Sequence, residues 1–363
     1  MRSVAEINLS NLIYNFNYIN SHIDQSKIMA VVKANAYGHG VSEVSQVLTK
    51  IGVYGLCVAI VEELEEIRKS KIDTPILHLG ALDSNKIEVY QKQENLCTIN
   101  SFQDIELINS FLEGTRQKIF CHLKLDTGMG RLGIDYNKSE EALKLIKSSK
   151  GRIVLRGVYS HLASSDESDT SFMNLQLDRF SSIIDLADMM MPEERDYHIS
   201  NSCNLLRTDF RIGNIVRPGI SLYGVNTSPI DHKLKPVMKL KAPIVLLKNI
   251  NKGSSIGYNR KFIAKKNMRV GYVQIGYADG YPVEMMNSTW VHCDSKLVSV
   301  IGKVSMDITA IDCTDINVDK GDWVTLFGEH ENRIESICSS IGENVYSVLT
   351  GISKRVARKY LYE

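Results

Sequence analysis

The sequence lacks both a long apolar run and an excess of charge of either sign. Its 363 residues include 43 lysines and arginines against 42 aspartates and glutamates. A balance this even gives no electrostatic reason to expect nucleic acid or a membrane surface as a partner. Because no apolar run approaches the roughly 18 residues that a bilayer span requires, we expect no transmembrane helix.

Cysteine is scarce, and its pattern argues against two classes of protein. The seven cysteines are scattered and never form a C-x-x-C pair. This speaks against a disulfide scaffold and against a zinc site, and it fits reduced thiols. The first nine residues carry Arg2 and Glu6 and alternate as a strand does, unlike a signal peptide. We therefore expect a cytoplasmic protein without a bound metal.

The sequence does contain enough apolar residues for two hydrophobic cores, since 44% of its 363 residues are hydrophobic. From about residue 10 to 225, short apolar strands alternate with helical patterns. The expected strands are residues 28–32, 55–59, 76–79, 96–99, 119–125, 154–159, 197–200 and 215–216, and the helices between them include 41–48, 62–68, 102–112, 140–146 and 172–189. This alternation predicts a closed (β/α)8 TIM-type barrel, with an open doubly wound sheet as the alternative.

The pattern changes after Asp231. Short strands separated by turns follow at residues 245–247, 270–275, 297–301, 308–311 and 323–327, with little helix before 333–341. This predicts a second, mainly β domain. We place the barrel at residues 10–230 and the β domain at 231–363, with a turn at 226–229 near the boundary. Residues 1–9 could add a strand to the β domain.

The residue that points most directly to chemistry is a lysine at the end of a predicted buried strand. Lys33 precedes a segment with Gly38 and Gly40, which predicts a tight turn into a helix beside an exposed Tyr37. Burying an ammonium group is costly unless the group is paired or loses its charge. A desolvated lysine with a lowered pKa suits Schiff-base chemistry, because only the neutral amine attacks a carbonyl. The alternative is a lysine whose ammonium extends into solvent.

Other polar residues also follow predicted barrel strands. In such barrels catalytic residues lie just after the strand C-termini, and phosphate sites favour the loops after strands seven and eight. The residues in these positions are Lys33, Lys124, Asp126, His161, Asn201, Ser202 and Arg217, the last followed by Pro218, Gly219 and Ile220. We expect them to gather on one rim of the barrel.

Several segments, taken together, resemble the alanine racemase family. Residues 31–40 (VVKANAYGHG) are similar to its pyridoxal-phosphate lysine motif, and residues 122–133 (HLKLDTGMGRLG) to its glycine-rich segment. In the predicted β domain, residues 255–260 (SIGYNR) resemble its catalytic tyrosine segment, 276–282 (GYADGYP) its entrance stretch and 302–307 (GKVSMD) its substrate loop. The resemblance covers essentially the whole chain, in order and with compatible spacing.

The resemblance implies a fold-type III pyridoxal 5'-phosphate enzyme that interconverts L-alanine and D-alanine and supplies D-alanine for peptidoglycan. Two bases on opposite faces of the substrate would exchange the Cα proton, because a single fixed base would have to cross the substrate plane. The resemblance assigns Lys33 to the D-isomer and Tyr258 to the L-isomer. Tyr258 and Met306 would reach the site from the other subunit, so a homodimer with shared active sites is implied.

The resemblance also implies the cofactor contacts, which are Lys33, Tyr37, His161, Ser202, Arg217, Gly219, Ile220 and Tyr346. Arg217 would hydrogen-bond the ring nitrogen, which an arginine cannot protonate, and His161 would orient Arg217. Ser202 and the backbone amides of Gly219 and Ile220 would bind the phosphate.

The remaining implied roles concern the substrate. They place Arg131 and Met306 at its carboxylate and Tyr277 and Tyr281 at the entrance. Lys124 would be carbamylated, since two cations packed together repel unless one is neutralised. The alternative is that Lys124 points into solvent while Asp126 pairs with Arg131.

Departures from the family pattern leave other functions open. Ser305, Lys303, Asn259 and Ala357 differ from the family's usual residues, so a racemase of broader specificity that accepts serine is one alternative. A non-catalytic pyridoxal-phosphate-binding protein is another, although that class lacks the β domain and the opposing tyrosine. A decarboxylase of the same fold type would lack the TGMGR segment. A metallohydrolase with a carbamylated lysine would need an H-x-H pair after the first strand, where this chain has a lysine.

Overall fold

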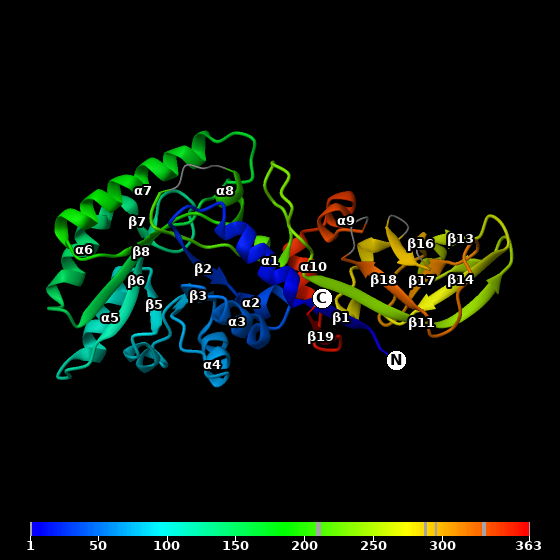
Figure 1. The fold of residues 1–363 in the computed structure, drawn as a ribbon, viewed down its shortest axis with the longest axis horizontal. Coiled ribbons are helices and arrows are strands. Elements are labelled where there is room, and N and C mark those ends of the chain that lie inside the picture. Colours follow the sequence, from blue (N-terminus) through cyan, green and yellow to red (C-terminus); the bar gives the residue numbers. More distant parts are fainter. Residues whose placement is uncertain (1, 208–211, 287–288, 295, 329–331, 363) are drawn as a thin grey trace.

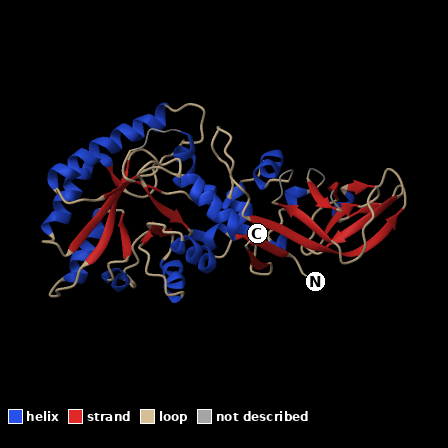
Figure 2. Cartoon of the chain, in the orientation of Figure 1, coloured by secondary structure: helices blue, strands red, loops and turns tan. Residues whose placement is uncertain are grey.

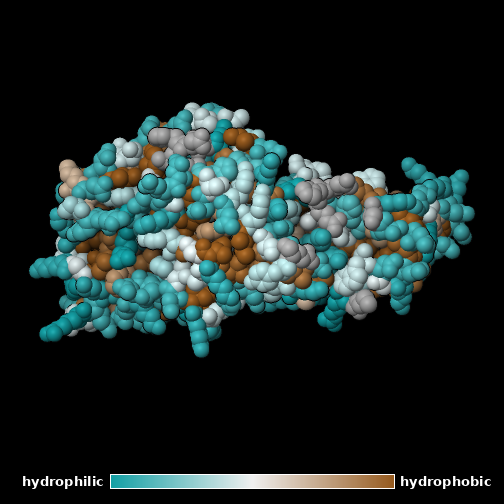
Figure 3. All heavy atoms as spheres, in the orientation of Figure 1, coloured by the Kyte–Doolittle hydropathy of each residue, from teal (hydrophilic) through white to brown (hydrophobic). Residues whose placement is uncertain are grey.

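The computed structural model describes the chain except for residues 1, 208–211, 287–288, 295, 329–331 and 363. Two sheets lie one after the other along the long axis of the molecule, and the chain begins in the second sheet, forms the first and then returns to complete the second (Figure 1). Helices surround the first sheet, whereas the second consists mostly of strands and turns (Figure 2). Hydrophilic side chains cover most of the visible face of both halves (Figure 3).

The first sheet is a parallel barrel. Its strands are β2 (Lys27–Val31), β3 (Gly55–Val58), β4 (Ile76–His78), β5 (Asn95–Ile99), β6 (Ile119–Asp126), β8 (Ile153–Tyr159), β9 (Asp196–His198) and β10 (Ile215–Val216), and the short β7 (Ile134–Asp135) pairs with β6. Neighbours pair in the order β10-β2-β3-β4-β5-β6-β8-β9. The ends of this order meet, because the amide of Arg217 donates to the carbonyl of Ser200 at 3.0 Å and that of Asn214 to Tyr197 at 3.0 Å. The barrel prediction is therefore confirmed, and the open doubly wound alternative is wrong.

Amphipathic helices cover the outside of the barrel. They are α1 (Leu9–Asn20), α3 (Val41–Lys50), α4 (Val61–Lys69), α5 (Phe102–Leu112), α6 (Ser139–Ser148), α7 (Ser171–Met190) and α8 (Ser202–Arg207), and the short α2 (Lys33–Tyr37) follows β2. Helix α5 shows why they form where they do. Ser101 and Asp104 make a capping box at its start, which stabilises the helix by about 1 kcal/mol. Ile105, Ile108 and Leu112 then bury one face against the barrel.

The second sheet has eight strands, in the order β14-β17-β16-β15-β18-β11-β1-β19. These are β1 (Val4–Asn8), β11 (Met238–Ile250), β14 (Met268–Val273), β15 (Trp290–Cys293), β16 (Lys296–Ile301), β17 (Thr309–Asp312), β18 (Trp323–Phe327) and β19 (Ala357–Leu361), with the hairpin β12 (Ser255–Ile256) and β13 (Phe262–Ile263) and the helices α9 (Ile334–Ile341) and α10 (Val345–Gly351) beside them. Because β11 also pairs with β14, six of the strands close a ring. A register shift between Ile244 and Leu246 lets β11 serve both partners.

The two halves share structure at their junction. Strand β1 lies between β11 and β19, so the first residues belong to the second sheet before the chain enters the barrel at α1. Asn15 of α1 is fully buried, and its amide bonds the carbonyls of Leu222 and Lys235 at 3.0 and 2.8 Å. One apolar core runs through both halves. The domain boundaries that we predicted stay a prediction.

Candidate active site

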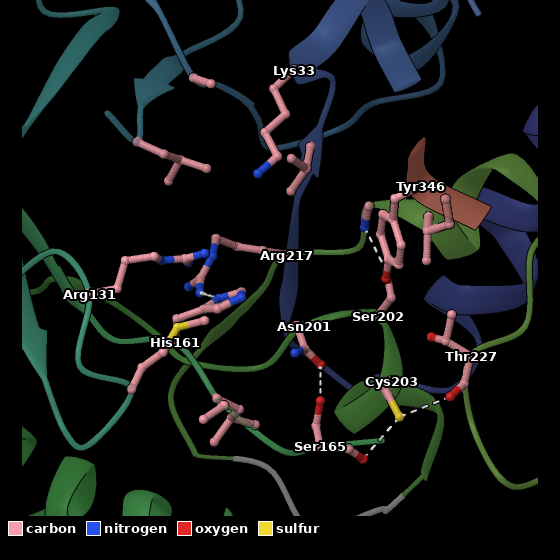
Figure 4. A pocket seen from close by; sticks show the side chains of 18 of the residues that line it. Lys33, Arg131, His161, Ser165, Asn201, Ser202, Cys203, Arg217, Thr227 and Tyr346 are labelled. Carbon is pink, nitrogen blue, oxygen red and sulfur yellow. Dashed lines mark hydrogen bonds between the residues drawn. The ribbon is translucent and has the colours of Figure 1, made fainter. Parts of the chain in front are cut away.

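A cavity of about 660 Å³ opens at the C-terminal ends of the barrel strands. Eleven of the residues singled out from the sequence line it, which are Lys33, Tyr37, Lys124, Arg131, His161, Asn201, Ser202, Arg217, Gly219, Ile220 and Tyr346. Figure 4 shows the Lys33 amine directed into this space, with Arg217 and Arg131 on one side and Ser202 and Tyr346 on the other. The rim predicted from the strand ends is thus one continuous wall.

Lys33 enters the cavity from an uncommon backbone conformation. The four residues after it, Ala34 to Tyr37, have φ values of 53, 55, 53 and 51°, which form a left-handed turn. Non-glycine residues pay about 1–2 kcal/mol each for this conformation, so surrounding structure has to hold it. Glu63 accepts the amide hydrogen of Ala34 at 2.5 Å, and the Asn35 side chain accepts that of Val41 at 2.9 Å. The sequence predicted a tight turn here but not its handedness.

The left-handed turn is also held by the C-terminal segment, by which we mean α10 and β19 (residues 345–361). A Cβ on Gly38 would collide with the carbonyl oxygen of Leu349 in α10, so only glycine fits. Arg358 in β19 donates to the Gly38 carbonyl at 3.0 Å. Tyr37 is only 7% exposed, so the predicted exposure of its ring is wrong: the turn directs the ring inward, 6.1 Å from that of Tyr346.

Burial and neighbouring charge change the chemistry of the Lys33 amine. Burial lowers the pKa of Lys33 below its ordinary value, and the positive charge of Arg131 lowers it further. The negative charge of Glu63 raises the pKa of Lys33 and so opposes part of this shift. The resulting shift favours the neutral amine, which is the form that attacks a carbonyl.

Small polar groups form the opposite end of the cavity. The hydroxyl of Ser202 accepts the amide hydrogen of Gly219 at 2.8 Å and lies 3.1 Å from the Ser221 hydroxyl. A Cβ on Gly219 would run into the hydroxyl of Tyr37. The Ser202 oxygen accepts these bonds, so its own hydroxyl hydrogen is left for a ligand in a space that glycine keeps open, which suits a phosphate group.

Arg217 is buried between these two ends and is almost fully hydrogen-bonded. One terminal nitrogen donates to Nδ1 of His198 and to the His198 carbonyl, the latter at 2.9 Å. The other donates to the Ser160 carbonyl at 2.7 Å and lies 3.3 Å from Nδ1 of His161. His161 therefore contacts Arg217, while its role in orienting that side chain stays a prediction.

Lys124 lies in the cavity wall and not in solvent. Its side chain is buried beneath the Tyr159 ring, with Nζ 5.5 Å from the ring centroid. Burial, followed by the charge of Arg131, lowers the pKa of Lys124 to about 8. Asp126 is used differently from the alternative that we considered, because its carboxylate accepts four backbone amides of residues 128–131 at 2.8–3.2 Å. It shapes the loop that carries Arg131.

Three predicted site residues lie on the β domain, away from this cavity. Tyr258, Tyr277 and Met306 are 64%, 45% and 52% exposed. Their loops adjoin. The amide of Tyr277 donates to the Ser305 carbonyl at 3.1 Å and that of Ala278 to the Met306 carbonyl at 3.0 Å. A Cβ on Gly257, next to Tyr258, would lie 3.2 Å from the amide nitrogen of Lys303. The three side chains form one exposed group, which we call the β-domain cluster.

Tyr281 does not fit the entrance role given to it. Its ring is 1% exposed, inside the core of the β domain. Gly280 adopts a left-handed conformation with φ of 95°, and the Tyr281 amide folds back to the carbonyl of Gly276 at 3.2 Å. The chain therefore turns inward immediately before Tyr281, and this assignment has to be withdrawn.

Several cavity residues were not predicted from the sequence. Ser165, Asp166, Cys203 and Thr227 line the cavity near the Ser202 end. Thr227 lies in the turn that we used only to mark the domain boundary. A lone threonine in a turn carries no sequence signal for a site, so the tertiary structure was needed to find it.

Comparison with known proteins places these features in a family. Residues 7–227 match the family described as "Alanine racemase, N-terminal domain" and residues 237–360 match "Alanine racemase, C-terminal domain". Alanine racemase 2 of Caldanaerobacter subterraneus subsp. tengcongensis is 35% identical over 99% of this chain and 94% of its own. Alanine racemase of Clostridium kluyveri is 34% identical over 98% of this chain and 93% of its own.

Solved structures are similar over the same length. Alanine racemase from Clostridium difficile 630 superposes with a TM-score of 0.92 at 34% identity, covering 100% of this chain and 96% of that one. Alanine racemase from Bartonella henselae, described with covalently bound pyridoxal phosphate, superposes with a TM-score of 0.89 at 27% identity, covering 99% and 100%.

Proposed function

The chain belongs to the alanine racemase family, and from this premise we propose that it interconverts L-alanine and D-alanine with pyridoxal 5'-phosphate as cofactor. D-alanine made in this way serves as a peptidoglycan precursor. The observation that carries the proposal is Lys33, an amine with a lowered pKa inside a cavity that also contains Ser202 and Arg217.

The cavity residues fit the cofactor. Lys33 would hold it covalently, Ser202 and Gly219 would bind its phosphate, and Arg217 would face its ring nitrogen. Tyr37 and Tyr346 would pack beside the phosphate end, with Ile220 beneath it. When bound, pyridoxal phosphate withdraws electrons from the amino acid that it carries and so makes the Cα–H bond acidic.

The protein's own groups then position the substrate and move its proton. Arg131 would bind the substrate carboxylate, with Met306 of a second copy beside it. Lys33 would take or return the Cα proton on one face, for the D-isomer, and Tyr258 on the other, for the L-isomer. A carbamylated Lys124 would supply a negative charge next to Arg131 and so fix its side chain. Arg217 stays protonated and can orient the ring without transferring a proton to it.

Tyr258 cannot act in the cavity of its own chain, because it lies on the exposed β-domain cluster. We therefore propose a head-to-tail homodimer, in which the β-domain cluster of each copy faces the cavity of the other. The charge distribution supports this arrangement. No acidic residue occurs between Asp231 and Asp279, where eleven lysines and arginines lie, whereas Asp166 lines the cavity.

A cytoplasmic location fits the thiols, since the seven cysteines are free and buried. No helix in the described residues is long and apolar enough to cross a bilayer. On the state of the cysteines we propose a cytoplasmic location.

The purified protein, supplied with pyridoxal 5'-phosphate, tests the function directly. We expect a new absorption band from the Schiff base and racemisation of alanine in both directions. Lys33→Ala should lose both, because it removes the covalent anchor and one base. Lys50→Ala, which changes an exposed lysine at the end of α3, is the matched control and should retain both. Normal activity of the Lys33→Ala variant would refute the proposal.

A further inference from the structure

Behind Arg217, a row of buried polar groups leads away from the cavity through the barrel. Nδ1 of His122 in β6 lies 2.8 Å from Nε2 of His198 in β9, and both rings are fully buried. Nε2 of His122 lies 3.8 Å from a carboxylate oxygen of Asp196, whose oxygens accept the Tyr54 hydroxyl at 3.0 and 3.1 Å. These groups have no part in the chemistry described so far.

The hydrogen bonds in this row run in one direction only. Arginine can donate but never accept, so Nδ1 of His198 has to be the acceptor of the Arg217 hydrogen. Its Nε2 then carries the proton and donates to Nδ1 of His122. The remaining proton of His122 lies on Nε2, which has no hydrogen-bond partner among the described residues. It faces a carboxylate oxygen of Asp196 at 3.8 Å, where the negative charge attracts the N–H without a hydrogen bond. Arg217 thus determines the tautomers of both rings.

Both histidines are also neutral. Burial lowers the pKa of His122 to about 3 and that of His198 well below its ordinary value, and the charge of Arg217 lowers both further. A carboxylate placed directly against Arg217 would cancel most of its charge. Two neutral rings give the guanidinium a fixed acceptor and leave its positive charge intact in the cavity.

The row has a consequence for the one donor of Arg217 that faces the cavity. Arg217 has five N–H hydrogens, and the four on its terminal nitrogens are directed at His198, Ser160 and His161. Among the residues that the structure describes, none accepts the Nε–H hydrogen. Losing the His198 acceptor would free a terminal nitrogen, and the guanidinium could then rotate about its last bonds.

We propose that His198, His122 and Asp196 are positioning residues that hold Arg217 with its Nε–H toward the cofactor ring nitrogen. The direction of the row follows from the protein alone, whereas naming the ring nitrogen depends on the proposed function. Hydrogen-bond partners of metal-binding histidines typically change affinity or activity by about 10- to 100-fold when removed, and we expect an effect of similar size for the partners of Arg217.

Neutron diffraction of the unmodified protein tests the direction of the row without any substitution. We expect hydrogen on Nε2 and none on Nδ1 of both His122 and His198. Hydrogen on Nδ1 of either ring would overturn the proposal. This measurement remains decisive even if the protein neither binds pyridoxal phosphate nor racemises alanine, an outcome that would refute only the proposed function.

Two substitutions in the holoenzyme test the effect on Arg217. His122→Leu removes the acceptor for His198, whereas His122→Gln keeps a side-chain oxygen that can accept from it. We expect His122→Leu to lower kcat about tenfold in both directions and to shift the cofactor absorption band, with the KM for alanine changed less than about twofold. His122→Gln should recover most of kcat and the native band.

The matched control is His78→Gln, because His78 is equally buried in the barrel but bonds Ala59 and Tyr90 instead of Arg217. It should lower the melting temperature while leaving the absorption band in place. A folded His122→Leu variant with native kcat and band would overturn the proposal, as would equal kcat values for the Leu and Gln variants. If His122→Leu does not fold, Asp196→Asn at the far end of the row should still shift the band, and an unchanged band there would count against the proposal.

Discussion

The reactive side chains of the barrel are mostly buried, whereas those of the β domain are exposed. In the barrel, Lys124 and Arg217 are 6% and 4% exposed and lie against the same cavity as Lys33. On the β domain, the Tyr258, Tyr277 and Met306 side chains of the β-domain cluster are about half exposed. Burial changes the chemistry of the barrel residues by lowering the pKa of both lysines. The β-domain cluster has no such enclosure within its own chain.

This difference indicates that each half is incomplete alone. The barrel cavity is lined by the proposed cofactor-binding residues and by Lys33, the proposed base for one face of the substrate. The proposed second base, Tyr258, and Met306 lie on the β domain and do not line this cavity. Single exposed apolar residues are ordinary in proteins, but three on adjoining loops suggest a surface that another molecule covers. The simplest assignment is a second copy of the chain.

The largest loss of activity should come from substituting Tyr258, the proposed base on the β domain. We expect Tyr258→Phe to leave cofactor binding unchanged and to lower racemisation about 10²- to 10⁴-fold, the usual range for a lost general base. Both net directions must fall together, because an enzyme cannot alter the solution equilibrium. Deuterium exchange into D-alanine should survive better than exchange into L-alanine, since Lys33 remains. Equal loss of both exchanges would refute the two-base assignment.

A second variant tests how the C-terminal segment supports the barrel. Gly38→Ala should destabilise the protein by several kcal/mol and weaken cofactor binding, because its Cβ would meet the Leu349 carbonyl and its φ is 84°. Gly52→Ala is the control: φ there is 85°, but the added Cβ meets nothing within 4 Å. Calorimetry should show a loss of only about 1 kcal/mol for it. Equal losses would show that conformation alone, and not the contact with α10, matters.

Lys124 offers a smaller effect that depends on pH. Because its pKa is lowered to about 8, the neutral amine becomes the main form as the pH rises through 8. Only the neutral amine reacts with carbon dioxide, so incorporation of ¹³C-labelled carbamate should increase above that pH. Lys124→Ala should raise the KM for alanine, and added chloride should lower it again by replacing the negative charge beside Arg131. A KM for this variant that equals the native value would contradict the role.

The smallest effect concerns substrate choice. Alanine should be preferred over serine, with lysine and arginine excluded, because Tyr346 narrows the cavity and Tyr277 would approach it from the second copy. Tyr277→Ala should raise the relative rate for larger amino acids by a few-fold only. A native enzyme that used lysine as fast as alanine would contradict the assignment of these rings to the entrance.

The barrel was predictable because buried parallel strands read as short apolar runs. All eight expected strands overlap observed ones, and the reactive residues at their ends meet as barrel geometry requires. The family resemblance added the roles, which no spacing could supply. The strands β15 and β19 were missed, since their residues are of mixed polarity. Strand β15 pairs with the next strand, β16, whereas β19 pairs with β1 at the far end of the sequence.

Three features depended on contacts that no local pattern encodes. The left-handed turn after Lys33 is held by Glu63 and by the C-terminal segment, which are far away in the sequence. Whether Tyr281 faced outward was decided by the turn at Gly280. The His122–His198 pair was overlooked because an isolated histidine in a strand usually signals only packing.

The central claim is that each active site takes Lys33 from one copy and Tyr258 from another, and mixing two inactive variants tests it most directly. Lys33→Ala and Tyr258→Phe, unfolded together and refolded in equal amounts, should form mixed dimers with one intact site of two. Because random pairing makes half of the dimers mixed, we expect roughly a quarter of native activity to return. Activity no higher than that of either variant alone would contradict the shared site.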